Sequence, residues 1–133
     1  MILEQRKGKE EMKTLLLVDD EQGIRFLLKS LFKREHPECT VTEAASIEEA
    51  LALLRGGYAY EYVLTDLDMP HSEGLSLIAI ARERLPQAKI GLMSGRMNED
   101  LAKLARVAGA DEVFCKPFGP EGRERLKTFA LSS

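Results

Sequence analysis

Short apolar runs alternate with amphipathic segments along most of this chain. The runs predict strands over residues 14–19, 40–44, 61–66, 89–94 and 111–115, and the segments between and after them predict helices over 22–35, 47–55, 73–85, 98–108 and 120–131. Strands that alternate with helices are typical of a parallel sheet with helices on both faces. The pattern therefore predicts an α/β fold, a doubly wound five-stranded parallel sheet with five helices.

The clearest helical pattern lies in residues 22–35. Five apolar side chains have the spacing of one helix face: Ile24, Leu27, Leu28, Leu31 and Phe32. We expect this face to pack on the sheet. Phe26 falls on the opposite face, where it is either an isolated exposed aromatic residue or a contact for a partner.

Length and composition fit one globular domain. The chain has 133 residues and 44% hydrophobic content, which suffices for a sizeable core. Residues 1–12 are mostly charged and predict a solvated tail, so we assign the folded domain to residues 13–133. Cys39 and Cys115 are expected to be reduced, since a domain with its own core rarely needs a disulfide.

Charge and hydropathy exclude two classes of partner. A formal net charge of -3 leaves no basic surplus for a nucleic-acid backbone. The apolar runs are shorter than a membrane span, and the N-terminus lacks the apolar core of a signal peptide. We therefore expect a cytoplasmic protein with no direct nucleic-acid or membrane contact.

Polar side chains stand where four of the predicted strands end. Asp19 and Asp20 follow the first apolar run, and the other three are Asp66, Ser94 and Lys116. The carboxyl ends of parallel strands meet at one edge of a sheet, where ligands bind. Two carboxylates about 5 Å apart repel each other by roughly 3 kcal/mol at an effective dielectric constant near 20. A divalent cation, Mg²⁺ or Mn²⁺, would offset this repulsion.

The same residues have a chemical division of labour. With Asp19 and Asp20 on a metal ion, Asp66 is available as a nucleophile toward phosphorus. Lys116 and Ser94 would then hold the transferred phosphoryl oxygens. Taken singly, each position has an ordinary interpretation: a helix N-cap at the first acidic pair, and turns or a strand exit at the others. Their joint occurrence at one edge favours the phosphoryl chemistry.

Over about residues 13–131 the chain resembles a receiver domain of a two-component response regulator. Five segments carry the resemblance: Leu15-Leu16-Leu17-Val18-Asp19-Asp20-Glu21, Asp66-Leu67-Asp68-Met69-Pro70 with Gly74, Met93-Ser94-Gly95, Gly109-Ala110-Asp111 and Lys116-Pro117-Phe118. The resemblance implies the flavodoxin-like fold with strand order 2-1-3-4-5. It also implies that a histidine kinase or phosphotransfer protein phosphorylates Asp66.

The resemblance further implies a role for each site residue. Asp20 and Asp66 would bind the metal directly, Asp19 largely through water, and Asp68 through its backbone carbonyl. Ser94 and Lys116 would sense the phosphoryl group. The protein would be a signalling switch that catalyses only its own phosphorylation and dephosphorylation.

The resemblance also implies an output surface. The fourth helix (98–108), fifth strand (111–115) and fifth helix (120–131) would form a face for a downstream protein or an output domain. A phosphorylation-dependent dimer is compatible with such a face. Whether the chain acts as a single-domain regulator or belongs to a longer protein stays open.

One residue departs from the family pattern, and one pair of residues is expected to tune the rate of dephosphorylation. Many receivers have an aromatic residue three positions before the lysine, whereas this chain has Val113, and Phe114 should face the other way. We therefore expect signalling mainly through backbone and loop movement around Ser94. Asp68 and Arg96 flank the expected path of the hydrolytic water, and a bridge between them would slow loss of the phosphoryl group.

Two alternatives remain. A pseudo-receiver would keep the fold as a protein-binding module without using phosphate, and only Val113 favours it. A phosphatase of the haloacid dehalogenase type is imitated by Asp66-Leu67-Asp68. In that superfamily the metal-binding acids follow the nucleophile, however, whereas here Asp19 and Asp20 precede it.

Overall fold

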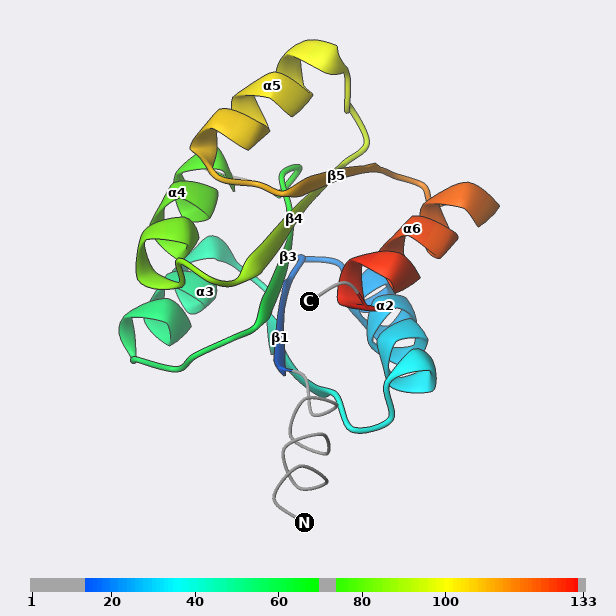
Figure 1. The fold of residues 1–133 in the computed structure, drawn as a ribbon, viewed down its shortest axis with the longest axis horizontal. Coiled ribbons are helices and arrows are strands. Elements are labelled where there is room, and N and C mark those ends of the chain that lie inside the picture. The colour runs from blue at the N-terminus through cyan, green and yellow to red at the C-terminus, as the bar shows by residue number, and fades with distance from the viewer. Residues whose placement is uncertain (1–13, 70–73, 132–133) are drawn as a thin grey trace.

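The computed structural model describes residues 14–69 and 74–131 (Figure 1). The elements are β1 (Thr14–Val18), α2 (Gln22–Glu35), β2 (Thr40–Ala44), α3 (Ile47–Arg55), β3 (Tyr62–Asp66), α4 (Gly74–Arg84), β4 (Lys89–Ser94), α5 (Glu99–Ala108), β5 (Glu112–Cys115) and α6 (Pro120–Leu131). These bounds agree with the predicted elements to within a residue at each end. The proposed tail at residues 1–12, Pro70 and position 73 lie outside the described residues.

The five strands form one parallel sheet in the order β2-β1-β3-β4-β5, which confirms the predicted fold class. After β1 the chain adds β2 on one side of it, and then returns to add β3 on the other side. Figure 1 shows α2 and α6 on one face of the sheet and α3, α4 and α5 on the other. The carboxyl ends of β1, β3, β4 and β5 therefore lie side by side at one edge.

Alternation along the strands divides the core into two clusters. Leu16 and Val18 contribute to the cluster under α3, α4 and α5, while Leu15 and Leu17 contribute to the cluster under α2 and α6. Successive side chains of a strand point to opposite faces, so a run that is buried on both sides must be apolar throughout. This is why β1 reads as a continuous apolar run.

Helix ends are fixed by local hydrogen bonds. The Ser46 side chain accepts from the Glu49 amide and begins α3, and the Asn98 side chain accepts from the Leu101 amide and begins α5. Gly109 ends α5 with a φ of 129°, which a residue with a Cβ rarely adopts. Such ends let short loops deliver each strand to the same edge.

The α2 helix corrects one detail of the sequence analysis. Leu28 and Phe32 are buried as expected, but Leu27 is 45% exposed and does not pack fully on the sheet. The buried stripe is narrower than predicted because the neighbouring α6 leaves a groove beside α2, which Leu27 lines. Phe26, on the outer face, is 72% exposed. None of the helices in the described part of the chain is long and apolar enough to cross a membrane.

Candidate functional site at the carboxyl edge of the sheet

Three carboxylates converge at the ends of β1 and β3. Asp19, Asp20 and Asp66 each offer an oxygen within 4.8 Å of the others. Asp19 and Asp66 are buried, whereas Asp20 is exposed. Asp19 accepts the Glu21 amide proton at 2.9 Å, and Asp66 accepts that of Asp68 at 3.1 Å. These bonds fix both buried carboxylates to the loops that follow their strands.

The first acidic pair does not cap a helix through its side chains. Glu21 is the N-cap residue of α2, and its side chain makes no capping hydrogen bond. Asp20, one member of that pair, lies exposed beside the two buried acids. The geometry therefore leaves the carboxylate of Asp20 available for a ligand.

Lys116 is the cation of the site. Its side chain is only 12% exposed, and the ammonium group lies 3.1 Å from Asp19 Oδ2 and 3.4 Å from Asp66 Oδ1. A third carboxylate, Glu21, lies 3.5 Å away. The Glu21 contact was missed in the sequence, although its place directly after Asp19-Asp20 was a usable signal. Lys116 thus links the ends of β1, β3 and β5.

Burial and charge shift the protonation equilibria of the cluster. Burial raises the pKa of both Asp19 and Asp66, and their mutual repulsion adds to the effect at Asp66. Burial by itself would lower the pKa of Lys116, but the hydrogen bond from its ammonium group to Asp19 and the charges of Asp19 and Asp66 raise it. The buried negative charge therefore exceeds what one lysine neutralises.

This charge excess fits a divalent metal ion. Oxygen ligands from carboxylates suit Mg²⁺, Mn²⁺ or Ca²⁺, and the exposed Asp20 gives the cluster an open side on which a hydrated ion keeps its waters. Among the described residues, this is the group of acidic, histidine and cysteine side chains close enough to hold an ion.

A second cluster forms around Asp68. Ser94 Oγ donates to Asp68 Oδ1 at 2.9 Å, and the Gly95 amide donates to Asp68 Oδ2 at 2.6 Å. The Arg96 guanidinium, mostly exposed, lies 3.5 Å from Oδ1. Burial alone would raise the pKa of Asp68, but the hydrogen bonds from Gly95 and Ser94 outweigh it, and the pKa is lowered. Asp68 and Arg96 thus meet, and Ser94 hydrogen-bonds to Asp68.

Arg25 supports the acidic edge from α2. Its guanidinium donates to the backbone carbonyl of Asp19 at 2.6 Å and to the Glu43 carboxylate on β2 at 2.9 Å. These contacts anchor the peptide between Asp19 and Asp20 to the neighbouring strand. Sequence reasoning missed Arg25, because nothing in the helical pattern marks which polar residue turns toward the sheet edge.

The two neighbouring residues of β5 point to opposite faces. Val113 is half-buried and packs against the cluster under α3, α4 and α5. Phe114 is buried in the other cluster, with its ring edge-on to Phe129 at 5.7 Å. The expected orientation of Phe114 is confirmed, so its ring does not take the place of an aromatic residue at position 113.

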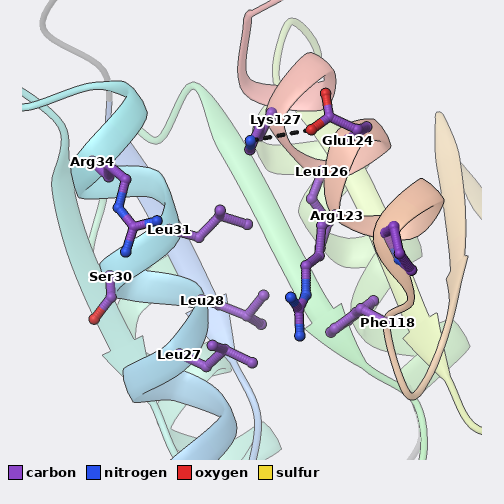
Figure 2. A pocket seen from close by; sticks show the side chains of 11 residues that line it. Leu27, Leu28, Ser30, Leu31, Arg34, Phe118, Arg123, Glu124, Leu126 and Lys127 are labelled. Carbon is purple, nitrogen blue, oxygen red and sulfur yellow. Dashed lines mark hydrogen bonds and ion pairs between the residues drawn. The ribbon is translucent and has the colours of Figure 1, made fainter.

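A groove of about 480 Å³ runs between α2 and α6, next to the loop that follows Lys116 (Figure 2). Figure 2 shows Leu27, Leu28 and Leu31 facing Leu126 and Phe118 across it. Three basic side chains and one acidic side chain stand at its rim (Figure 2): Arg34, Arg123, Lys127 and Glu124, the last two paired at 3.1 Å. Phe118 lies two residues after Lys116, so the groove adjoins the carboxylate site.

Sequence comparison gives consistent relatives. A family profile described as a response regulator receiver domain matches residues 15–127. The protein named Regulator of RpoS from Escherichia coli strain K12 is 36% identical over 119 residues, 89% of this chain and 34% of that protein. The aerobic respiration control protein ArcA from the same strain is 36% identical over 109 residues, 80% of this chain and 43% of that protein. The chain therefore spans less than half of either curated relative.

Solved structures with the same fold include a response regulator from Burkholderia pseudomallei described with a phosphorylated aspartic acid, a calcium ion and citrate. It is 27% identical, with a TM-score of 0.74, and the match covers 90% of this chain and 71% of that one. A response regulator from Thermotoga maritima is 27% identical, with a TM-score of 0.77 and coverage of 91% and 99%. Vibrio cholerae CheY4, 24% identical with a TM-score of 0.77 over 92% and 99% of the chains, shows the fold alone.

Proposed function

This chain belongs to the response regulator receiver domains of two-component signalling systems, and we propose that Asp66 is its phosphoryl acceptor. One observation carries the proposal: the buried Asp66 carboxylate lies between two further acids and Lys116 at the carboxyl edge of the sheet. The phosphoryl donor would be a sensor histidine kinase or a phosphotransfer protein.

The transfer needs only the residues at this edge and a divalent ion. An ionised oxygen of Asp66 attacks the donor's phosphorus and forms an acyl phosphate. The bond from phosphorus to the donor's nitrogen breaks, and its electron pair stays on that nitrogen. Lys116 compensates negative charge on the phosphoryl oxygens as they approach, since its ammonium group already lies 3.4 Å from Asp66.

Receiver domains bind a divalent metal ion at their acidic cluster, and we assign Mg²⁺ or Mn²⁺ to this chain. Asp20 and Asp66 would hold the ion directly, Asp19 largely through water, and Asp68 through its backbone carbonyl. A bound divalent ion neutralises charge on the phosphoryl oxygens during transfer. Calcium is the ion described for the Burkholderia pseudomallei relative.

The phosphoryl donor is expected to dock in the groove between α2 and α6. The groove has an apolar floor and a rim with three basic side chains against one acidic side chain, and it adjoins the loop that follows Lys116 (Figure 2). An amphipathic helix with acidic flanks would match this surface and place its phosphohistidine near Asp66. Leu27, which lines the groove and is 45% exposed, would be part of that contact.

The output face is assigned to α5, β5 and α6. It presents the exposed side chains Leu104 and Val107 on α5. Arg125 of α6 donates to the Val113 carbonyl and pairs with Glu112, so α6 and β5 are held together. Because Val113 is not aromatic, the signal would pass through the loop at Ser94 and not through a rotating ring. A cytoplasmic location and a phosphorylation-dependent dimer stay predictions.

The Asp68–Arg96 pair is assigned to retention of the phosphoryl group. The pair lies two residues beyond Asp66 and Ser94, at the exposed side of the site. An exposed ion pair of this kind is worth under about 1 kcal/mol, so its effect would be on access of water and not on stability. Arg96→Ala should therefore speed dephosphorylation, and an unchanged rate would contradict this assignment.

The direct test of the proposed function is phosphorylation by a small donor. The protein is incubated with Mg²⁺ and acetyl phosphate, and the intact mass is measured. We expect a phosphate mass shift that is absent in Asp66→Asn and in reactions with excess chelator. A wild-type protein that acquires no phosphate would favour the pseudo-receiver alternative. The haloacid dehalogenase alternative is not favoured, because the relatives are response regulators.

A further inference from the structure

The loop after β4 supplies further hydrogen-bond donors for the expected phosphoryl group, besides Lys116. Met93 is the register partner of Asp66 in the sheet, so Ser94 and Gly95 stand one and two residues beyond it at the same edge. A phosphoryl group on Asp66 carries three terminal oxygens, each of which needs a donor or a cation. The Ser94 hydroxyl and the Gly95 amide are therefore the donors that it would use from this side.

In the structure, one carboxylate takes both of these donors. Asp68 accepts from Ser94 at 2.9 Å through Oδ1 and from Gly95 at 2.6 Å through Oδ2. The Ser94 hydroxyl has a single proton, and its oxygen also accepts from the Arg96 amide at 3.0 Å. Ser94 therefore cannot donate to a phosphoryl oxygen while it donates to Asp68.

We infer that the Asp68 carboxylate acts as an internal competitor for the phosphoryl-binding donors. Its two negatively charged oxygens accept the hydrogen bonds that the phosphoryl oxygens would accept. The carboxylate must therefore leave Ser94 and Gly95 before these can bind the phosphoryl group. This inference rests on the proposed function of Asp66 and adds a positioning residue that opposes phosphorylation. It concerns the unphosphorylated state, whereas retention of the phosphoryl group by the Asp68–Arg96 pair concerns the phosphorylated one.

Charge gives the competition a direction. Asp68 and a phosphoryl group on Asp66 are both anions on residues two positions apart in the chain, so they repel each other. The Arg96 guanidinium already lies 3.5 Å from Asp68 and its side chain is 77% exposed, so the two can stay paired over the site when the carboxylate leaves Ser94 and Gly95. Phosphorylation would thus transfer two hydrogen bonds from Asp68 to the phosphoryl group and rearrange the loop at Ser94.

The test compares initial rates of phosphorylation by acetyl phosphate at saturating Mg²⁺, with the intact mass of the protein as the readout. Asp68→Ala frees both donors, and we expect its rate to exceed that of the wild type by about tenfold, which corresponds to about 1.4 kcal/mol. The matched control is Glu83→Gln, which removes an exposed carboxylate near the end of α4, at the opposite edge of the sheet. Its rate should equal that of the wild type.

A double-mutant cycle separates competition from a structural effect. In a Ser94→Ala chain one of the two donors is already absent, so the gain from Asp68→Ala should be clearly smaller than in the wild type. The Gly95 amide proton resonance of the unphosphorylated protein should also move upfield in Asp68→Ala, since it loses a charged acceptor.

Each outcome bears on one claim. A wild-type protein that is not phosphorylated would overturn the proposed function. A wild-type protein that is phosphorylated as fast as or faster than Asp68→Ala would overturn only the competition, and so would an equal gain in the Ser94→Ala background. A selective gain with an intact Ser94 supports it.

Discussion

Replacing Asp66 by asparagine should stabilise the metal-free protein while abolishing its phosphorylation. Asp66 is buried, and one of its oxygens lies within 4.8 Å of oxygens of Asp19 and Asp20. Asparagine has nearly the same shape, and its side-chain oxygen can still accept the Asp68 amide proton that Asp66 accepts at 3.1 Å. The substitution therefore removes the charge and keeps the local geometry.

The magnitude follows from three opposing contributions. Asp66 and Asp19 offer oxygens that lie within 4.8 Å of each other, so their repulsion is at least about 3 kcal/mol at an effective dielectric constant near 20. Attraction to Lys116 at 3.4 Å is about 5 kcal/mol on the same scale. Burial of the carboxylate costs several kcal/mol more, which is why the pKa of Asp66 is raised. The unfavourable contributions exceed the favourable one, and we expect a gain of about 1–2 kcal/mol in the free energy of unfolding.

Urea denaturation with excess chelator measures this gain, and repetition in Mg²⁺ provides the discriminating comparison. A ligand present at a hundredfold excess over its dissociation constant stabilises the folded state by about 2.7 kcal/mol. The wild type should receive more of this stabilisation than Asp66→Asn, which lacks one of the proposed metal ligands, so the difference in the free energy of unfolding narrows or reverses. Glu83→Gln, a control at the far edge, should stay within about 0.5 kcal/mol of the wild type in both conditions. A metal-free Asp66→Asn less stable than the wild type would refute the charge argument.

Three further substitutions test other contacts. The hydrogen bond from Arg25 lowers the pKa of Glu43. The pair therefore stabilises the fold above the unfolded-state pKa of Glu43, and this stabilisation is lost as the pH falls through the folded-state pKa. In urea denaturation, Glu43→Gln should lower the free energy of unfolding by under about 1 kcal/mol at neutral pH and leave it unchanged in acid. A Cβ at Gly91 would lie 3.0 Å from the Phe114 ring, so Gly91→Ala should lower the free energy of unfolding by about 1–3 kcal/mol; an unchanged midpoint would show that the ring yields freely. Arg82 donates to three backbone carbonyls and one carboxylate. Arg82→Ala should therefore lower the free energy of unfolding by about 1–3 kcal/mol and speed amide hydrogen exchange in the loop before β5. Unchanged exchange in that loop would show that Arg82 does not hold it in place.

The candidate site divides into predictable and unpredictable contacts. Asp19, Asp66 and Lys116 were placed together from the sequence, because each stands where a strand ends and parallel strands end at one edge. The hydrogen-bond acceptor of the Ser94 hydroxyl could not be predicted from the ends of the strands. Ser94 and Asp68 are 26 residues apart, and the choice between Asp66 and Asp68 as acceptor depends on the path of two loops.

The sequence by itself determined the order and type of the elements, the parallel sheet and the identity of the acidic edge. These features follow from the spacing of apolar residues, which is local and repeats along the chain. Only the tertiary structure decided which side chains meet across loops and helices. It placed Asp68 on the donors at Ser94 and Gly95 and left Leu27 in a groove beside α6. The physical reason is that a hydrogen bond depends on positions within a few tenths of an ångström between segments distant in sequence, which no periodicity encodes.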